Sequence, residues 1–259
     1  SRAHEGLVDV LQIGRNDPLG YFYYVMELAD DASASVAADV RRRTDSSQES
    51  RSPVTPFSSP DSYVPKTLSA ELKTRGRLPL AECLPLALAL SDALGFLHRR
   101  GLVHRDLKPS NIIFVEGVPK LADIGLVTET AEARTFVGTE GFIPPEGPGT
   151  AQADIFGLGK VFYQMWTGKD RHDFPDLPSD LAEATDRPDC LRLNEIILKA
   201  CEGNTQKRYQ TAEQLSADLL GIKTGEPLMD AAKSWFRPMQ WLSKVAPLFA
   251  GSANDTASA

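Results

Sequence analysis

Apolar residues recur at two different spacings along the chain, and each spacing predicts one kind of element. Near the N-terminus, apolar positions alternate with polar ones over residues 7–13, and an aromatic and β-branched run follows at 21–26. A stretch rich in Gly, Asn, Asp and Pro separates the two runs. Alternation with a period of two, interrupted by turn residues, predicts a β-hairpin.

Further along, the spacing changes to that of an α-helix. Over residues 80–100 leucine and alanine return every three or four positions and Gly101 follows, so we expect one long helix that ends there. A second, shorter hairpin is expected over 112–122, with its turn at 116–117. More helices are expected at 153–167, 191–201 and 211–220.

Composition limits the partners and the location. The net charge is −7 and there is no long basic run, which argues against nucleic acid or an anionic membrane as the main partner. No uninterrupted apolar run reaches the roughly 18 residues of a membrane span, so we expect no transmembrane segment in this chain. The three cysteines lack metal-ligand spacing and are expected to be buried thiols in a cytoplasmic protein. A membrane anchor outside the chain stays open.

The strongest local pattern lies between the long helix and the second hairpin. It runs His104-Arg-Asp-Leu-Lys-Pro-Ser-Asn111, and Asp123-Ile124-Gly125 follows the hairpin. The two motifs together resemble the catalytic loop and the metal-binding turn of protein kinases. Phosphoryl transfer depends on aligning two oxygens and neutralising phosphate charge, which carboxylates, amides and bound magnesium can do.

The resemblance assigns a role to each polar residue. Asp106 is expected to orient the substrate hydroxyl and accept its proton, and Lys108 to steady the transferred phosphate. Asn111 and Asp123 are expected to bind Mg²⁺ and, through it, ATP, because this cation prefers oxygen ligands. His104 is expected to pack beneath the loop.

Other matches follow in the family's order. The stretch from Val137-Gly138-Thr139 to Pro144-Pro145-Glu146 resembles the segment that positions the protein substrate, and Glu146 is expected to pair with Arg208. Asp154 resembles the aspartate that accepts backbone N–H bonds from the catalytic loop. A plain helix N-terminal acid also fits Asp154, and both readings can hold at once.

The segment between the metal-binding turn and Glu146 holds candidate phosphorylation sites at Thr128, Thr130 and Thr135. Arg105, beside the catalytic aspartate, could pair with an added phosphate and order the segment. An unmodified surface hydroxyl is the alternative for each threonine.

The strand at 21–26 resembles the one that leads into the hinge between kinase lobes. The resemblance then implies that Met26 walls the adenine pocket and that the backbone of Glu27 and Ala29 bonds adenine. Lys108 and Ser110 in the loop favour the serine/threonine subclass over the tyrosine subclass.

Two family features have no counterpart in the sequence. The glycine-rich loop and the phosphate-anchoring lysine belong upstream of the hinge, yet the first lysine of the chain is Lys66. A fragment and a natural short form that has lost catalysis both explain this. We favour the fragment because the catalytic and metal-binding residues are intact, and we expect the chain alone to bind ATP weakly and to have little activity. Ile124, in place of the usual Phe, is a mild departure.

These observations predict an α+β, protein kinase-like fold with a mainly helical C-terminal lobe and a remnant of the β N-terminal lobe. The expected function is that of a bacterial eukaryotic-like serine/threonine protein kinase using ATP and Mg²⁺ on protein substrates. A pseudokinase-like scaffold is the main alternative. A small-molecule phosphotransferase ranks last, because such enzymes lack the segment ending at Glu146.

The expected organisation has four parts. Residues 1–29 form the end of the N-terminal lobe and the hinge, and 67–222 form the C-terminal lobe. Between them, 30–66 is rich in Ser, Thr, Asp, Arg and Pro, and is expected to be a flexible insertion because it can bury little apolar surface. The tail at 223–259 is amphipathic but interrupted by prolines, so packing on the domain and a juxtamembrane stub both stay open.

Overall fold

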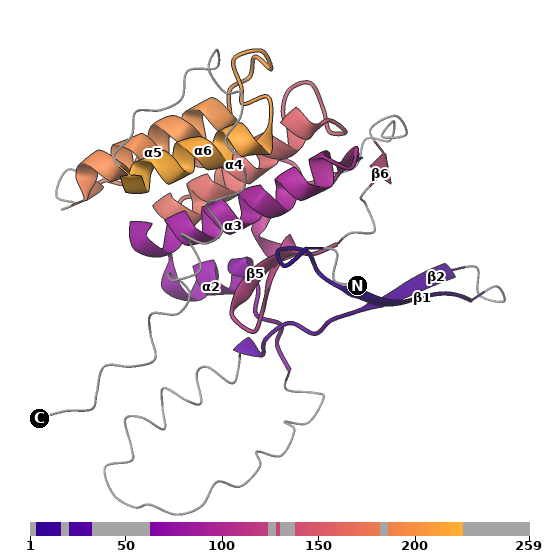
Figure 1. Cartoon of the computed structure of the whole chain (residues 1–259). Coiled ribbons are helices and arrows are strands. Elements are labelled where there is room, and N and C mark those ends of the chain that lie inside the picture. Colours follow the sequence, from indigo (N-terminus) through magenta and orange to yellow (C-terminus); the bar gives the residue numbers. More distant parts are fainter. Residues whose placement is uncertain are drawn as a thin grey trace, which may run out of the picture.

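Packed helices form the body of the chain, and a β-hairpin projects from one side of it (Figure 1). The computed structural model describes residues 4–16, 21–32, 63–123, 128–129, 138–181 and 186–224. The helices are α2 (Leu68–Arg75), α3 (Leu80–His98), α4 (Ala151–Thr167), α5 (Arg187–Ala200) and α6 (Ala212–Thr224).

Helix α4 is the centre of this body. Most of its side chains are buried, which is typical of a helix with packing partners on several sides. It contacts α3 and α5, and α6 packs against the same two helices. The helix begins where the side chain of Thr150 accepts a hydrogen bond from Ala153 N (3.0 Å), and it ends at Gly168, whose φ of 72° suits glycine. Both ends are therefore fixed by local sequence.

Short antiparallel pairs make up the β structure. The projecting hairpin joins β1 (Val10–Asn16) to β2 (Tyr21–Met26). A second pair, β4 (Ile112–Val115) and β5 (Val118–Leu121), lies against α3 through β5 and against α2 through β4. A short pair of β3 (Leu102–Val103) and β6 (Thr128–Glu129) completes the described strands.

The elements predicted from apolar spacing are confirmed, with shifts at their ends. Both hairpins form, and the turn of the second has positive φ at Glu116 (52°) and Gly117 (77°), as a tight two-residue connection requires. Helix α5 begins four residues before the expected Leu191, at the Arg187-Pro188 start that favours a helix N-terminus. Helix α2 was not predicted, because its sequence carries few apolar residues.

The ends of the expected insertion lie next to each other. Asp31 and Pro65 form an isolated β-bridge, and Lys66 N donates to Asp30 O (2.7 Å). The carboxylate of Asp30 accepts from Glu116 N (2.8 Å) and from Gly117 N (2.9 Å), at the turn of the second hairpin. The chain therefore leaves the body and returns at one anchored point. Residues 33–62 lie outside the described residues, as does the tail from residue 225.

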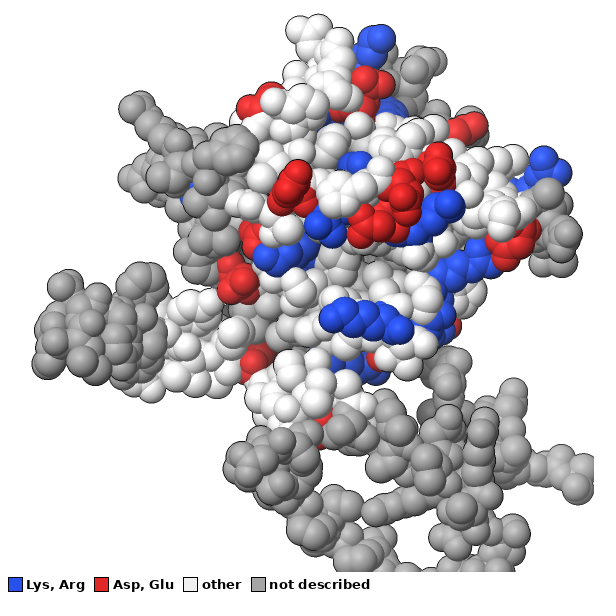
Figure 2. Space-filling model, turned by 180° about the vertical axis from the view of Figure 1, so that it is seen from behind, with Lys and Arg blue, Asp and Glu red and all other residues white. Residues whose placement is uncertain are grey.

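Helix α3 is the one described helix with the length and composition to cross a bilayer. It packs against α4, α6 and β5, and half of its most apolar stretch is buried inside the protein. A core helix has the same composition, so this is weak evidence for a membrane span. On the face shown in Figure 2, acidic and basic side chains are intermixed over the body.

The three cysteines are free and buried, as their spacing predicts. Burial raises the pKa of Cys83 to about 12 and that of Cys201 to about 12, and it also raises the pKa of Cys190. Because the thiolate is the reactive form, the folded chain at pH 8 should resist a thiol reagent such as dithionitrobenzoate. All three thiols should react within minutes in denaturant. Rapid labelling of any of them in the folded chain would contradict this packing.

Candidate active site

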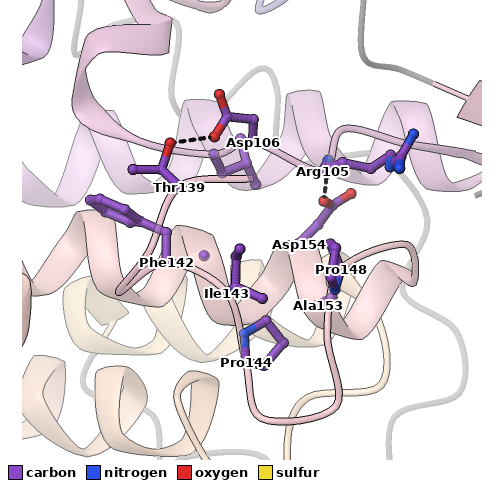
Figure 3. A pocket seen from close by; sticks show the side chains of 11 residues that line it. Arg105, Asp106, Thr139, Phe142, Ile143, Pro144, Pro148, Ala153 and Asp154 are labelled. Carbon is purple, nitrogen blue, oxygen red and sulfur yellow. Dashed lines mark hydrogen bonds between the residues drawn. The ribbon is translucent and has the colours of Figure 1, made fainter. Parts of the chain in front are cut away.

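The catalytic-loop motif lies between β3 and β4, and a buried carboxylate holds its backbone. Asp154, in the first turn of α4, accepts from His104 N (2.7 Å) and from Arg105 N (2.8 Å), as Figure 3 shows for Arg105. The side chain of His98 lies 3.0 Å from the same carboxylate. The expected contact between Asp154 and the loop is confirmed, and the helix N-terminus favours the same negative charge.

These bonds hold the loop in a strained shape. Arg105 has a φ of 75°, which is costly for a residue with a side chain and persists only where the surroundings impose it. The adjacent His104 is fully buried, and its Nε2 lies 2.9 Å from Ala122 O. This contact fastens the loop to the residue before Asp123. His104 thus packs beneath the loop, as expected.

Four polar side chains form one hydrogen-bond network at the end of this loop. Asp106 Oδ2 accepts from Lys108 Nζ (2.6 Å) and from Asn111 Nδ2 (3.0 Å). Its other oxygen, Oδ1, accepts from Thr139 Oγ1 (2.7 Å), the bond drawn in Figure 3, and Lys108 Nζ also donates to Thr139 Oγ1 (2.9 Å). The sequence placed Thr139 in the substrate segment but gave no sign of its contacts with Asp106 and Lys108.

The charge state of Asp106 follows from these contacts. Burial alone would raise the pKa of this carboxyl, but the hydrogen bonds from Lys108 and Thr139 outweigh it and hold the pKa below its usual value. Asp106 is therefore an anion at neutral pH, with both oxygens already directed by donors.

Asn111 and Asp123 are brought close by the pairing of β4 with β5. Asn111 O accepts from Ala122 N (2.9 Å), immediately before Asp123. The Nδ2 group of Asn111 donates to the backbone oxygen of Asp106 (2.9 Å) and to its carboxylate, so the amide oxygen faces away from Asp106. Asp123 has a φ of 64°, and its Oδ1 accepts from Tyr24 OH (3.2 Å).

This donor set suits magnesium. Mg²⁺ usually takes one or two protein oxygen ligands and completes its shell with phosphate and water. An amide oxygen and a carboxylate oxygen are such ligands. The described residues hold no group of three or more His, Cys, Asp or Glu side chains that could hold a metal ion.

The predicted adenine-binding residues lie where the hairpin joins the body. Glu27 N donates to Asp9 O (3.0 Å), and the Glu27 carboxylate accepts from Lys120 Nζ (2.5 Å) in a mostly buried ion pair. The carbonyl of Ala29 accepts from Tyr63 OH (3.0 Å), and Met26 is partly exposed. The sequence did not predict the pair of Glu27 and Lys120, which lie 93 residues apart.

A buried arginine holds the far end of the substrate segment. Arg208 Nη1 and Nη2 lie 2.5 Å and 3.2 Å from the two oxygens of Glu146, and the arginine side chain is fully buried. The expected ion pair is confirmed. A small pocket lies between this segment and the catalytic loop, and Figure 3 shows Phe142 and Ile143 on one side of it and Asp106 on another.

Several expected residues lie outside the described residues. They are Ile124, Gly125, Thr130, Thr135 and Val137. For Thr128 the backbone is described, in β6, but the side chain is not. Their roles stay predictions.

A carboxylate and a lysine on one loop, an amide and a second carboxylate beside them, and an ion-paired segment that ends at Glu146 form the arrangement that the resemblance to protein kinases implies. The comparisons agree. The family described as the protein kinase domain matches residues 61–223, more than half of the chain, and the chain belongs to this family.

Curated relatives include bacterial kinases. The serine/threonine-protein kinase PknB of Mycobacterium leprae is 30% identical over 183 residues, covering 62% of this chain and 29% of the relative. A probable serine/threonine-protein kinase of Clostridium perfringens is 32% identical, covering 71% of this chain and 30% of the relative. PknG of Mycolicibacterium smegmatis is 33% identical, covering 56% and 20%. The chain thus spans less than a third of the length of these relatives.

The anchoring role of Asp154 can be measured as stability. Asp154→Ala leaves the buried N–H groups of His104 and Arg105 without an acceptor, and should lower the free energy of unfolding by about 3 kcal/mol. Asp154→Asn keeps one acceptor oxygen and should cost less. Urea unfolding of both variants checks this, with Asp180→Ala in an exposed ion pair as the control expected to change little. Equal stability of Asp154→Ala and wild type would contradict the assignment.

Proposed function

We propose that the chain is the catalytic part of a serine/threonine protein kinase, which transfers the terminal phosphate of ATP to Ser or Thr hydroxyls of proteins. The observation that carries the proposal is the network of Asp106, Lys108, Thr139 and Asn111 beside Asp123. Each of these side chains has a task in phosphoryl transfer, and the names of the bacterial relatives support the same activity.

Asp106 orients the hydroxyl of the substrate and accepts its proton as the phosphate bond forms. Its carboxylate is ionised at neutral pH, which a proton acceptor requires. Lys108 carries a positive charge beside it and neutralises charge on the transferred phosphate. Thr139 bonds both groups, so it couples the catalytic loop to the segment that positions the protein substrate.

Asn111 and Asp123 hold magnesium in this proposal. The cation, when bound with ATP, neutralises phosphate charge and lets the phosphates approach the carboxylate of Asp106. The protein's share is to keep the two oxygen ligands in place. The backbone bond between Asn111 and Ala122, and the bond of His104 to Ala122, do this.

The hinge residues bind adenine. The N–H of Glu27 already donates to Asp9 and the carbonyl of Ala29 already accepts from Tyr63, so the carbonyl of Glu27 and the backbone N–H of Ala29 are the groups for adenine, with Met26 beside the ring. The ion pair of Glu27 with Lys120 keeps this backbone against β5.

A cytoplasmic location also belongs to the proposal. Three cysteines without disulfide bonds suit a reducing compartment.

A phosphorylation assay with radiolabelled ATP and a general protein substrate tests the proposal. The longest product of the gene should transfer phosphate in a Mg²⁺-dependent way, and the 259-residue chain much more slowly. Asp106→Asn should lower kcat by about 10² to 10⁴ because the proton acceptor is lost.

Asp180→Asn, a change of the same chemistry at an exposed ion pair, should leave the rate unchanged. If Asp106→Asn and the wild type transfer phosphate equally fast, the assignment of Asp106 is wrong. If the longest product binds ATP but transfers no phosphate to any protein, a scaffold role replaces the kinase role.

A further inference from the structure

The hairpin touches the metal-binding turn through one side chain that the kinase motifs do not include. Tyr24, on β2, donates its hydroxyl hydrogen bond to Asp123 Oδ1 at 3.2 Å, across 99 residues of sequence. Other described contacts of residues 4–29 with the body lie before β1 or after β2, among them those of His4 with Asp92, Val8 with Leu121 and Glu27 with Lys120. Tyr24 is thus a connection from the hairpin strand itself to the proposed metal ligand.

The backbone conformation of Asp123 is one that needs support from neighbouring groups. Its φ of 64° is in the left-handed region, which side-chain-bearing residues adopt only when their surroundings impose it. The orientation of the Asp123 carboxylate therefore depends on the groups that form hydrogen bonds with it. Within the described part of the chain, Tyr24 donates a hydrogen bond to this carboxylate.

The chemistry of Tyr24 and Asp123 sets which of the two donates the hydrogen bond. A tyrosine hydroxyl can donate, and an ionised carboxylate can only accept, so the phenol donates to Asp123. The bond occupies one lone pair of Oδ1 and limits rotation of the carboxylate, which leaves Oδ2 to face a cation. Tyrosine also suits a partly buried position, because its ring packs while its hydroxyl stays in polar surroundings.

We propose that Tyr24 is a positioning residue for the divalent cation: it holds the Asp123 carboxylate in the orientation that binds the metal. The inference rests on the proposed function, because Asp123 must be a metal ligand for it to matter. Partners that orient a metal-binding side chain typically change metal affinity by 10- to 100-fold when they are removed. For a single bond of 3.2 Å to a partly exposed phenol, the low end of that range is expected.

The test measures binding, not turnover. Mn²⁺, as a spectroscopic stand-in for Mg²⁺, is titrated into the 259-residue chain without nucleotide, and free Mn²⁺ is counted by electron paramagnetic resonance. Tyr24→Phe should raise the Kd for Mn²⁺ about tenfold with no change in melting temperature. In an Asp123→Asn background, the same substitution should have no further effect, since the residue acts through that carboxylate.

Tyr163→Phe is the matched control. It removes a tyrosine hydroxyl on α4 that donates to Asp176 O (2.9 Å), away from the proposed metal ligands. Its loss leaves a carbonyl without that donor, so this variant should melt at a lower temperature with an unchanged Kd for Mn²⁺. The two variants therefore separate an effect on the metal from an effect on the fold.

The outcomes separate the role of Tyr24 from the metal-binding role of Asp123. If Tyr24→Phe binds Mn²⁺ as tightly as wild type while Asp123→Asn binds it weakly, the role of Tyr24 is refuted and the kinase site stands. If Tyr24→Phe weakens Mn²⁺ binding equally with and without Asp123, the effect does not pass through this carboxylate and the inference fails. If wild type and Asp123→Asn bind Mn²⁺ equally, the metal site and the inference both fail.

Discussion

The carboxylate of Asp154, buried at the start of the central helix, is the interaction on which the site depends. By accepting the backbone N–H groups of His104 and Arg105, it fixes a strained loop to the best-packed element of the body. That loop in turn presents Asp106 and Lys108. An unpaired carboxylate could not remain buried there, and an unanchored loop could not keep its strain, so each requires the other.

The two sides of the proposed site are built differently. The catalytic loop and the proposed metal ligands rest on a body whose apolar side chains are buried, whereas the hairpin above the adenine position exposes Leu11 (66%) and Ile13 (75%). Figure 2 shows the described part of this hairpin as a largely uncharged arm. Few buried contacts mean low local stability, so the hairpin is held less firmly than the helical body. Contacts that join the hairpin to the body, such as the ion pair of Glu27, just after β2, with Lys120, are therefore important for holding the hairpin in place.

Sequence predicted what local patterns encode. Helix α3 and the β4–β5 hairpin follow from apolar spacing and turn residues, and the pair of Glu146 with Arg208 follows from motif order. Helix α2 was missed because its position depends on burial of Leu68 and not on an apolar stripe. The contacts of Thr139 with Asp106, and of Tyr24 with Asp123, join residues far apart in sequence, and no local pattern in one chain carries that information.

The central claim is that residues of the catalytic loop and of the metal-binding turn meet on one nucleotide. A crystal structure of the chain with an ATP analogue and Mn²⁺, with anomalous scattering to locate the metal, tests it most directly. We expect a Mn²⁺ peak bonded to Asn111 Oδ1 and to the Asp123 carboxylate, with the terminal phosphate beside Asp106. A metal bound elsewhere, or a triphosphate that reaches only one of these two aspartates, would contradict it.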